Sequence, residues 1–197
     1  MISSADQGLR RSVRLAATLN LAYFFVEFTV ARVIGSVSLF ADSVDFLEDA
    51  SLDFLILAAL DWSLRSRAKL GMALAGILLI PGLATLWTAG QKFLVPIPPA
   101  PLALSLAGFG ALAVNLSCAL MLAQHRHYSG SLTKAAFLSA RNDALANVAI
   151  ILAGLLTAST RSAWPDLIVG LGIAVINADA AREVWQAARD EHRTAEA

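Results

Sequence analysis

Long apolar stretches alternate with short connections along nearly the whole chain. Six of these stretches approach the length of about 20 residues that an α-helix needs to cross a bilayer. They cover residues 13–35, 37–62, 69–92, 102–124, 133–158 and 164–187. One of the connections, residues 96–101, is rich in proline and cannot continue a helix. The pattern therefore predicts an all-α membrane protein with six transmembrane helices.

The same pattern divides the chain into one membrane domain and two short ends. We expect a cytoplasmic N-terminal segment over residues 1–12, a six-helix domain over residues 13–187 and a short cytoplasmic tail over residues 188–197. The apolar run after Arg14 contains Glu27 and lacks a small-residue cleavage site. We therefore expect the first helix to be retained rather than removed as a signal peptide.

Composition agrees with a membrane protein. Hydrophobic residues make up 57% of the chain, charged residues make up 15%, and the mean hydropathy is +0.65. A soluble domain usually has about a quarter of its residues charged. The formal net charge is zero, so the composition gives no sign of a nucleic-acid partner.

The basic residues lie unevenly on the two sides of the predicted membrane. An even number of spans puts both termini on one side, and that side holds eleven lysines and arginines. The opposite side holds only Arg32, Lys92 and Arg161. Cytoplasmic loops carry the excess of positive charge, so we expect both termini in the cytoplasm. All four tryptophans fall near predicted span ends, as an aromatic belt would place them.

The second span differs from an ordinary one because it carries Asp42, Asp45, Asp49 and Asp53, at intervals of three, four and four residues. At about 100° per residue, the four aspartates fall within roughly an 80° arc of one helix face. A carboxylate at membrane depth costs roughly 2.5 to 3.5 kcal/mol on the mildest insertion scale. Several of them on one helix therefore predict a polar cavity or a bound cation.

The fifth span offers a matching set of polar groups. Asp45 and Asp49 are spaced i, i+4, so that two side chains can reach one ion. Ser139 and Asp143 in the fifth span repeat this spacing. Asn142 and Asn147 lie along the same general side of that helix. If the two helices pack together, three carboxylates, a hydroxyl and one or two amides converge inside the bundle.

Five other polar residues are candidates for an accessory pathway: Glu27, Asp42, Asp53, Asn147 and Asn20. Glu27 could serve proton or metal passage, or it could pair with Arg141. Asp42 could attract cations at a cavity mouth or cap the second helix. Asp53 could relay metal on the cytosolic side or pair with a basic residue, and Asn20 fits a hydrogen bond between helices.

These motifs occur in an order that resembles the cation diffusion facilitators, which are metal ion/proton antiporters with six transmembrane helices. The resemblance covers residues 13–187. It rests on Leu19-Asn20-Leu21 with Glu27, on Gly35-Ser36-Val37-Ser38-Leu39-Phe40-Ala41-Asp42-Ser43, on Asp45-x-x-x-Asp49, on Asn142-Asp143-Ala144-Leu145-Ala146-Asn147 and on Trp164-Pro165-Asp166.

The resemblance implies a tetrahedral transport site made by Asp45, Asp49, Asp143 and position 139. Zinc-transporting members have His at that position and manganese-transporting members have Asp, whereas this chain has Ser139. Asn142, or a water held by Ser139, could supply the fourth ligand instead. Most members also carry a cytoplasmic domain after the sixth helix. We expect a short form of the family without this domain, whose homodimer is held by the membrane helices.

The expected function is export of a divalent metal ion from the cytoplasm in exchange for protons, with no catalytic residues and no permanent cofactor. An all-oxygen site suits manganese or ferrous iron and leaves zinc, cadmium and cobalt open. High alanine and arginine content hints at a bacterial cytoplasmic membrane. Two alternatives stay open: a non-transporting subunit of a complete transporter, and a membrane enzyme of the CDP-alcohol phosphotransferase type, whose aspartate motif fits residues 42–46 poorly.

Overall fold

The computed structural model describes residues 4–59, 83–123 and 130–176, apart from the side chains of residues 4–6, 55, 56, 58, 59 and 130–141. Every secondary-structure element in these ranges is helical. The helices are α1 (Ser4–Ile34), α2 (Val37–Ala59), residues 83–94, α4 (Pro101–Ala123), α5 (Gly130–Thr160) and Trp164–Ile176. The prediction of an all-α protein with six helices is confirmed, although parts of the third and sixth predicted spans lie outside the described residues.

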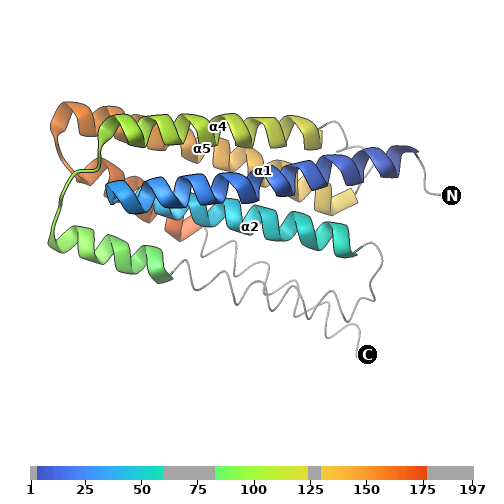
Figure 1. Cartoon of the computed structure of the whole chain (residues 1–197), viewed down its shortest axis with the longest axis horizontal. Helices are drawn as coiled ribbons and strands as arrows, with labels where there is room; N and C mark the ends of the chain where they lie inside the picture. Colours follow the sequence, from blue (N-terminus) through green and yellow to red (C-terminus); the bar gives the residue numbers. More distant parts are fainter. Residues whose placement is uncertain (1–3, 60–82, 124–129, 177–197) are drawn as a thin grey trace.

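The helices lie side by side as an elongated bundle (Figure 1). α1 packs along α2, and α4 packs along α5. Contacts of α1 with α4 and of α2 with α5 join the two pairs. The connections over residues 35–36, 95–100 and 161–163 lie at one end of the bundle, whereas α1 begins at the other end (Figure 1).

The outer surface of the bundle is apolar. Three described helices, Gln7–Ile34, Pro101–Ala123 and Asn142–Thr160, are long and apolar enough to cross a membrane. Large side chains such as Phe25, Leu120 and Leu152 are exposed on these helices. Many polar side chains, among them Glu27, Asp42 and Asn147, lie buried between the helices. A lipid environment favours this distribution, because it solvates apolar groups and leaves polar groups to pair inside the protein.

Gly35 and Ser36 form the sharp turn that joins α1 to α2. Gly35 adopts a φ of 65°, in the left-handed region where an L side chain is disfavoured, and so ends α1. The Ser36 amide donates back to the carbonyl of Ala31 at 3.0 Å. The Ser36 hydroxyl then accepts a hydrogen bond from the Leu39 amide at 3.1 Å, which caps the start of α2. The sequence Gly-Ser thus sets the antiparallel pairing of the first two helices.

Small residues allow the helices to approach closely. A Cβ atom added at Gly108 in α4 would lie 2.9 Å from Cγ2 of Ile150 in α5. A Cβ atom added at Gly170 would lie 2.7 Å from the backbone of Val37 and Ser38 at the start of α2. Close backbone contacts of this kind are a common means of helix association in membranes.

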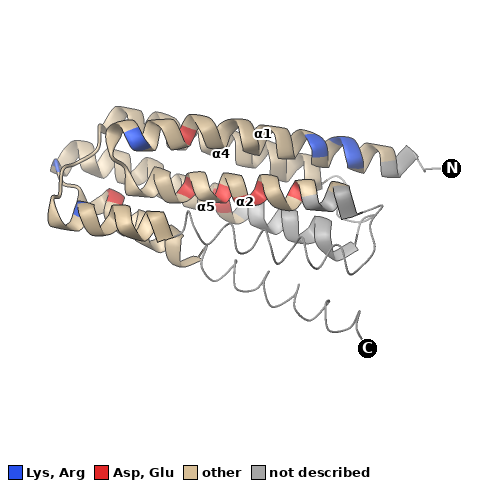
Figure 2. Cartoon of the chain, turned by 60° about the horizontal axis from the view of Figure 1, so that its bottom comes forward, with Lys and Arg blue, Asp and Glu red and all other residues tan. Residues whose placement is uncertain are grey.

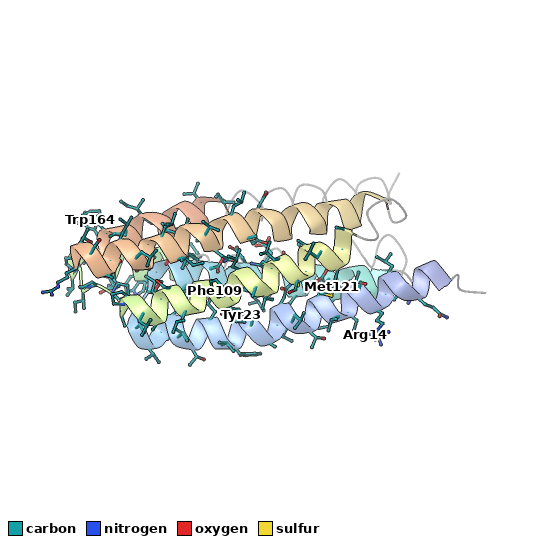
Figure 3. All side chains as sticks on the ribbon, turned by 90° about the horizontal axis from the view of Figure 1, so that it is seen from above. Arg14, Tyr23, Phe109, Met121 and Trp164 are labelled. Carbon is teal, nitrogen blue, oxygen red and sulfur yellow. The ribbon has the colours of Figure 1, made fainter. Side chains whose placement is uncertain are left out.

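Two of the four tryptophans lie in the described part of the chain. Trp87 and Trp164 are both exposed, and the Trp164 ring meets the edge of the Phe93 ring at 5.8 Å between centroids. Trp164 and Arg14 lie near opposite ends of the bundle (Figure 3). This placement agrees with the expected aromatic belt at one membrane interface, whereas Trp62 and Trp185 lie outside the described residues.

Candidate metal-transport site

The acidic residues of α2 lie in the interior of the bundle. Asp42, Asp45, Glu48 and Asp53 are buried, and Asp49 is half-buried. Figure 2 shows these acidic residues along the length of α2, with basic residues towards the ends of the bundle. Because α2 is enclosed by its neighbours, its carboxylates meet other side chains rather than lipid.

Asp143 of α5 completes a group of three carboxylates with Asp45 and Asp49 of α2. The Asp49 and Asp143 side chains lie within hydrogen-bonding reach of each other. Asp45 and Asp143 are close enough to repel each other. One oxygen of Asp143, Oδ2, is buried without a hydrogen-bond donor among the described residues. The structure therefore brings together the three aspartates that the i, i+4 spacings single out.

These carboxylates are neighbours but do not form a closed cage. Among the described side chains, no three His, Cys, Asp or Glu residues converge tightly enough to hold one ion as the helices stand. Asn142 is exposed, unlike Asp143 beside it. Adjacent helix positions differ by about 100° around the axis, which explains why the two residues separate. The side chain of Ser139, the other candidate fourth ligand, lies outside the described part.

A chain of hydrogen bonds fixes Asp42 beside this group. The Asn147 amide of α5 donates to Asp42 Oδ2 at 2.6 Å. Asn115 of α4 in turn donates to Asn147 Oδ1 at 2.9 Å. All three side chains are almost fully buried. The chain links three helices and shows that Asp42, which the sequence left as either a cation attractor or a helix cap, is held by an amide from another helix.

Glu27 of α1 faces Asp42. Its side chain is fully buried, and its carboxyl group lies within hydrogen-bonding reach of the Asp42 carboxyl group. Neither oxygen of Glu27 finds a hydrogen-bond donor in the described part of the chain. The side chain of Arg141, the partner proposed for Glu27 from the sequence, is not among the described side chains.

Asn20 and Asp53 lie on the other side of the three aspartates, towards the N-terminal end of α1. Asn20 is buried and accepts a hydrogen bond from the Cys118 thiol at 3.6 Å, so it joins α1 to α4. Asp53 is buried and lies near both Asp49 and Cys118. This hydrogen bond between helices agrees with the role that the sequence analysis gave to Asn20.

A second polar network closes the opposite end of the bundle. The Asp166 carboxylate is fully buried and accepts hydrogen bonds from the Val37 and Ser38 amides at 3.0 and 3.1 Å. It also accepts from the Ser36 and Ser38 hydroxyls, each at 2.6 Å. Lys92 lies 3.6 Å from Asp166 and donates to the Gly35 carbonyl. The carboxylate thus caps α2 where the helix dipole favours a negative charge.

Sequence analysis did not find the partners in these two networks. Asn115 is a lone amide in an apolar span, and such a residue in a membrane helix is itself a signal of a buried hydrogen bond. Asp166 and the Gly35–Ser38 segment both belong to the recognised motifs. Their contact joins residues about 130 positions apart, which helical spacing does not reveal.

A bundle of apolar helices with carboxylates buried on two facing helices defines a class of protein: a multi-pass membrane transporter of cations. The comparison with known families agrees. The cation efflux transmembrane domain matches residues 13–190, and the chain therefore belongs to this family, the cation diffusion facilitators, and is a metal cation transporter. No curated protein matches the chain. The resemblance that the motifs predicted is confirmed.

Proposed function

We propose that this protein exports a divalent transition-metal ion from the cytoplasm in exchange for protons. Asp45, Asp49 and Asp143 bind the metal, with Ser139, Asn142 or a water as the fourth ligand. The observation that supports this proposal best is the proximity of the three aspartates on α2 and α5 inside the bundle. Carboxylates at membrane depth are costly and rare, and those that occur commonly mark ion or proton pathways.

The ligand chemistry admits several metals. The three proposed protein ligands are carboxylates, and oxygen ligands suit manganese and ferrous iron. Zinc, cobalt and cadmium bind carboxylates as well, and zinc binds more tightly than manganese at a given site. The substrate class is therefore a zinc-type divalent cation, and the experiment below identifies the ion.

Proton exchange follows from the charge of the site. Three carboxylates at short range repel one another, more strongly in a medium of low dielectric than in water. Protons therefore bind to the metal-free site, and an arriving divalent cation displaces them. Rocking of one helix group against another then exposes the loaded site to the opposite side of the membrane.

The proposal also covers the orientation of the protein, its oligomeric state and the membrane in which it lies. Both termini lie in the cytoplasm, so that the end of the bundle holding Lys92 and Asp166 faces outward. A homodimer forms through the membrane helices, and the membrane is the cytoplasmic membrane of a bacterium. The bias of basic residues towards the side of the termini supports the orientation.

The test is metal uptake into proteoliposomes that contain the purified full chain, under an imposed pH gradient. Zinc, cadmium, cobalt, manganese and ferrous iron are tested one by one. We expect proton-coupled uptake of at least one ion, and a loss of at least about tenfold in the Asp49→Ala variant, since a tenfold change needs only about 1.4 kcal/mol of lost binding. Ser51→Ala is the matched control, because Ser51 lies on the same helix and its hydroxyl donates to the Leu47 carbonyl of that helix.

Three outcomes contradict the proposal in different ways. Uptake that is insensitive to the pH gradient excludes antiport. Uptake that Asp49→Ala leaves intact excludes the assigned site. If folded protein takes up none of the ions, the non-transporting subunit becomes the better interpretation, and CDP-dependent lipid synthesis by the purified chain would indicate the enzyme instead.

A further inference from the structure

Glu27 and Asp42 form a pair of acidic side chains that the proposed metal site does not use. Both are fully buried, and they lie on adjacent helices, α1 and α2. Asp42 precedes Asp45 by three residues, which places its Cα about 4.5 Å further along α2 towards the Lys92 end, and about 10 Å beyond Asp49. The pair therefore occupies a separate layer of the bundle, next to the three aspartates.

The two carboxyl groups lie within hydrogen-bonding reach of each other, but when both are ionised neither can donate a hydrogen bond. Both oxygens of Glu27 and Oδ1 of Asp42 lack a donor among the described residues. The fourth oxygen, Asp42 Oδ2, accepts from Asn147 at 2.6 Å. Two ionised carboxylates in this position would each be desolvated and would repel each other. One proton between them removes the repulsion and leaves one buried charge to be desolvated instead of two.

Among the described side chains, the groups that surround the pair supply no such hydrogen. Tyr23, one turn before Glu27 on α1, uses its hydroxyl proton to bond the Ala107 carbonyl at 2.7 Å. The Asn147 amide donates to Asp42 Oδ2, and Asn115 donates to Asn147 rather than to the pair. In the described part of α2 and α5, the charged residues that face the pair are Asp45, Asp49 and Asp143, which are all acidic. Lys92 is bound to Asp166 at the end of the bundle.

From these contacts we infer that Glu27 and Asp42 share one proton and form a second cation site, distinct from the metal site. A proton fits better than a metal ion, because the described residues offer three free oxygens on two side chains here, whereas divalent ions take four or more ligands. The neighbouring oxygen of Asn147 already accepts from Asn115.

This inference extends the proposed function, since it assigns part of the proton counter-flow to the pair. A divalent cation bound by Asp45, Asp49 and Asp143 adds positive charge next to Glu27 and Asp42. The added charge favours ionisation of the pair, so the shared proton leaves when the metal arrives. When the metal leaves, the pair takes up a proton again. The pair thus adds about one proton to those that the three aspartates exchange.

The first test needs no metal and no transport. Infrared spectra of the metal-free full chain in lipid should contain the C=O band of a protonated carboxyl group. Other buried carboxyl groups contribute to the same band, so the test compares variants with the natural chain. Glu27→Gln should remove the component of the band that belongs to the pair, because the glutamine amide can donate to Asp42 in place of the proton. Asp42→Asn should remove the same component, and it replaces the first variant if that one fails to fold. The control Glu48→Gln removes a buried carboxyl group outside the pair and should leave the pair's component in place. A band that neither pair variant changes overturns the inference.

The second test counts protons. Zinc or manganese is added to the folded chain in weak buffer with a pH-indicator dye. We expect Glu27→Gln to bind metal and to release about one proton fewer per metal ion than the natural chain. An unchanged proton count overturns the inference, and so does a loss of metal binding in folded Glu27→Gln, which would make Glu27 a metal ligand. The infrared test does not involve metal. It can therefore contradict the shared proton while the uptake experiment supports the antiporter, and the uptake experiment can contradict the antiporter while the shared proton is supported.

Discussion

At the scale of single residues, the ion pair between Lys92 and Asp166 shows how a charge is tolerated inside the bundle. Asp166 accepts four hydrogen bonds from the start of α2, so its negative charge is compensated by polar hydrogens as well as by the lysine. This one carboxylate joins the last described helix to the start of α2 and to Lys92 in the helix over residues 83–94.

Asp166→Asn should therefore destabilise the protein. The substitution leaves Lys92 buried without its counter-charge and weakens the cap of α2. Breaking a buried pair by removing one partner costs about 3 kcal/mol. Thermal unfolding of the purified protein in detergent should show a clear fall in melting temperature. The double variant Asp166→Asn/Lys92→Met should recover part of the loss, because no lone charge remains. A single variant that melts like the natural chain would contradict this account.

The residues of the candidate site differ in how far the sequence could predict them. The spacing of Asp45 and Asp49, and the position of Asp143, follow from helix periodicity, and the structure brings these three together. Asn115 could not be assigned, because its partner Asn147 lies on another helix and the register between helices depends on packing. For the same reason, the contact between Glu27 and Asp42 required the structure.

At the scale of helices, hydropathy located the spans but not the ends of the helices. α1 begins at Ser4, well before the predicted span at residue 13, because a helix can continue beyond the apolar stretch into its polar flank. The start of α2 at Val37 agrees with the prediction, since Gly35 and Ser36 give a specific stop and cap signal. Boundaries are therefore predictable where turn chemistry marks them.

Packing between helices gives a prediction at the same scale. Gly170→Val places a side chain against the backbone of Val37 and Ser38, which cannot move aside without disturbing the Asp166 cap. Overpacking of this kind costs about 1 to 3 kcal/mol. Gly172→Val is the matched control, because nothing lies within 4 Å of a Cβ atom added there. Thermal unfolding should separate the two variants, and equal melting temperatures would contradict the proposed contact.

At the scale of the whole molecule, the bundle has two chemically different ends. One end carries the connections over residues 35–36, 95–100 and 161–163, with Trp164, while the other carries the start of α1 with Arg14 (Figures 1 and 3). The buried acidic residues of α2 lie between these ends (Figure 2). Asp53, Asp49, Asp45 and Asp42 follow one another along α2 between the two ends, in the interior of the bundle.

The proposed direction of transport requires that the end with Trp164 faces outward, and cysteine labelling can test this. The chain has one cysteine, Cys118, which is buried, so Cys118→Ser provides a background without reactive thiols. Ile97→Cys in this background lies in an exposed connection and should react with a membrane-impermeant maleimide on intact cells. Gln7→Cys, exposed at the start of α1, should react only after the cells are permeabilised. The reverse labelling pattern would contradict the proposed orientation in the membrane. It would also contradict the proposed direction of metal transport.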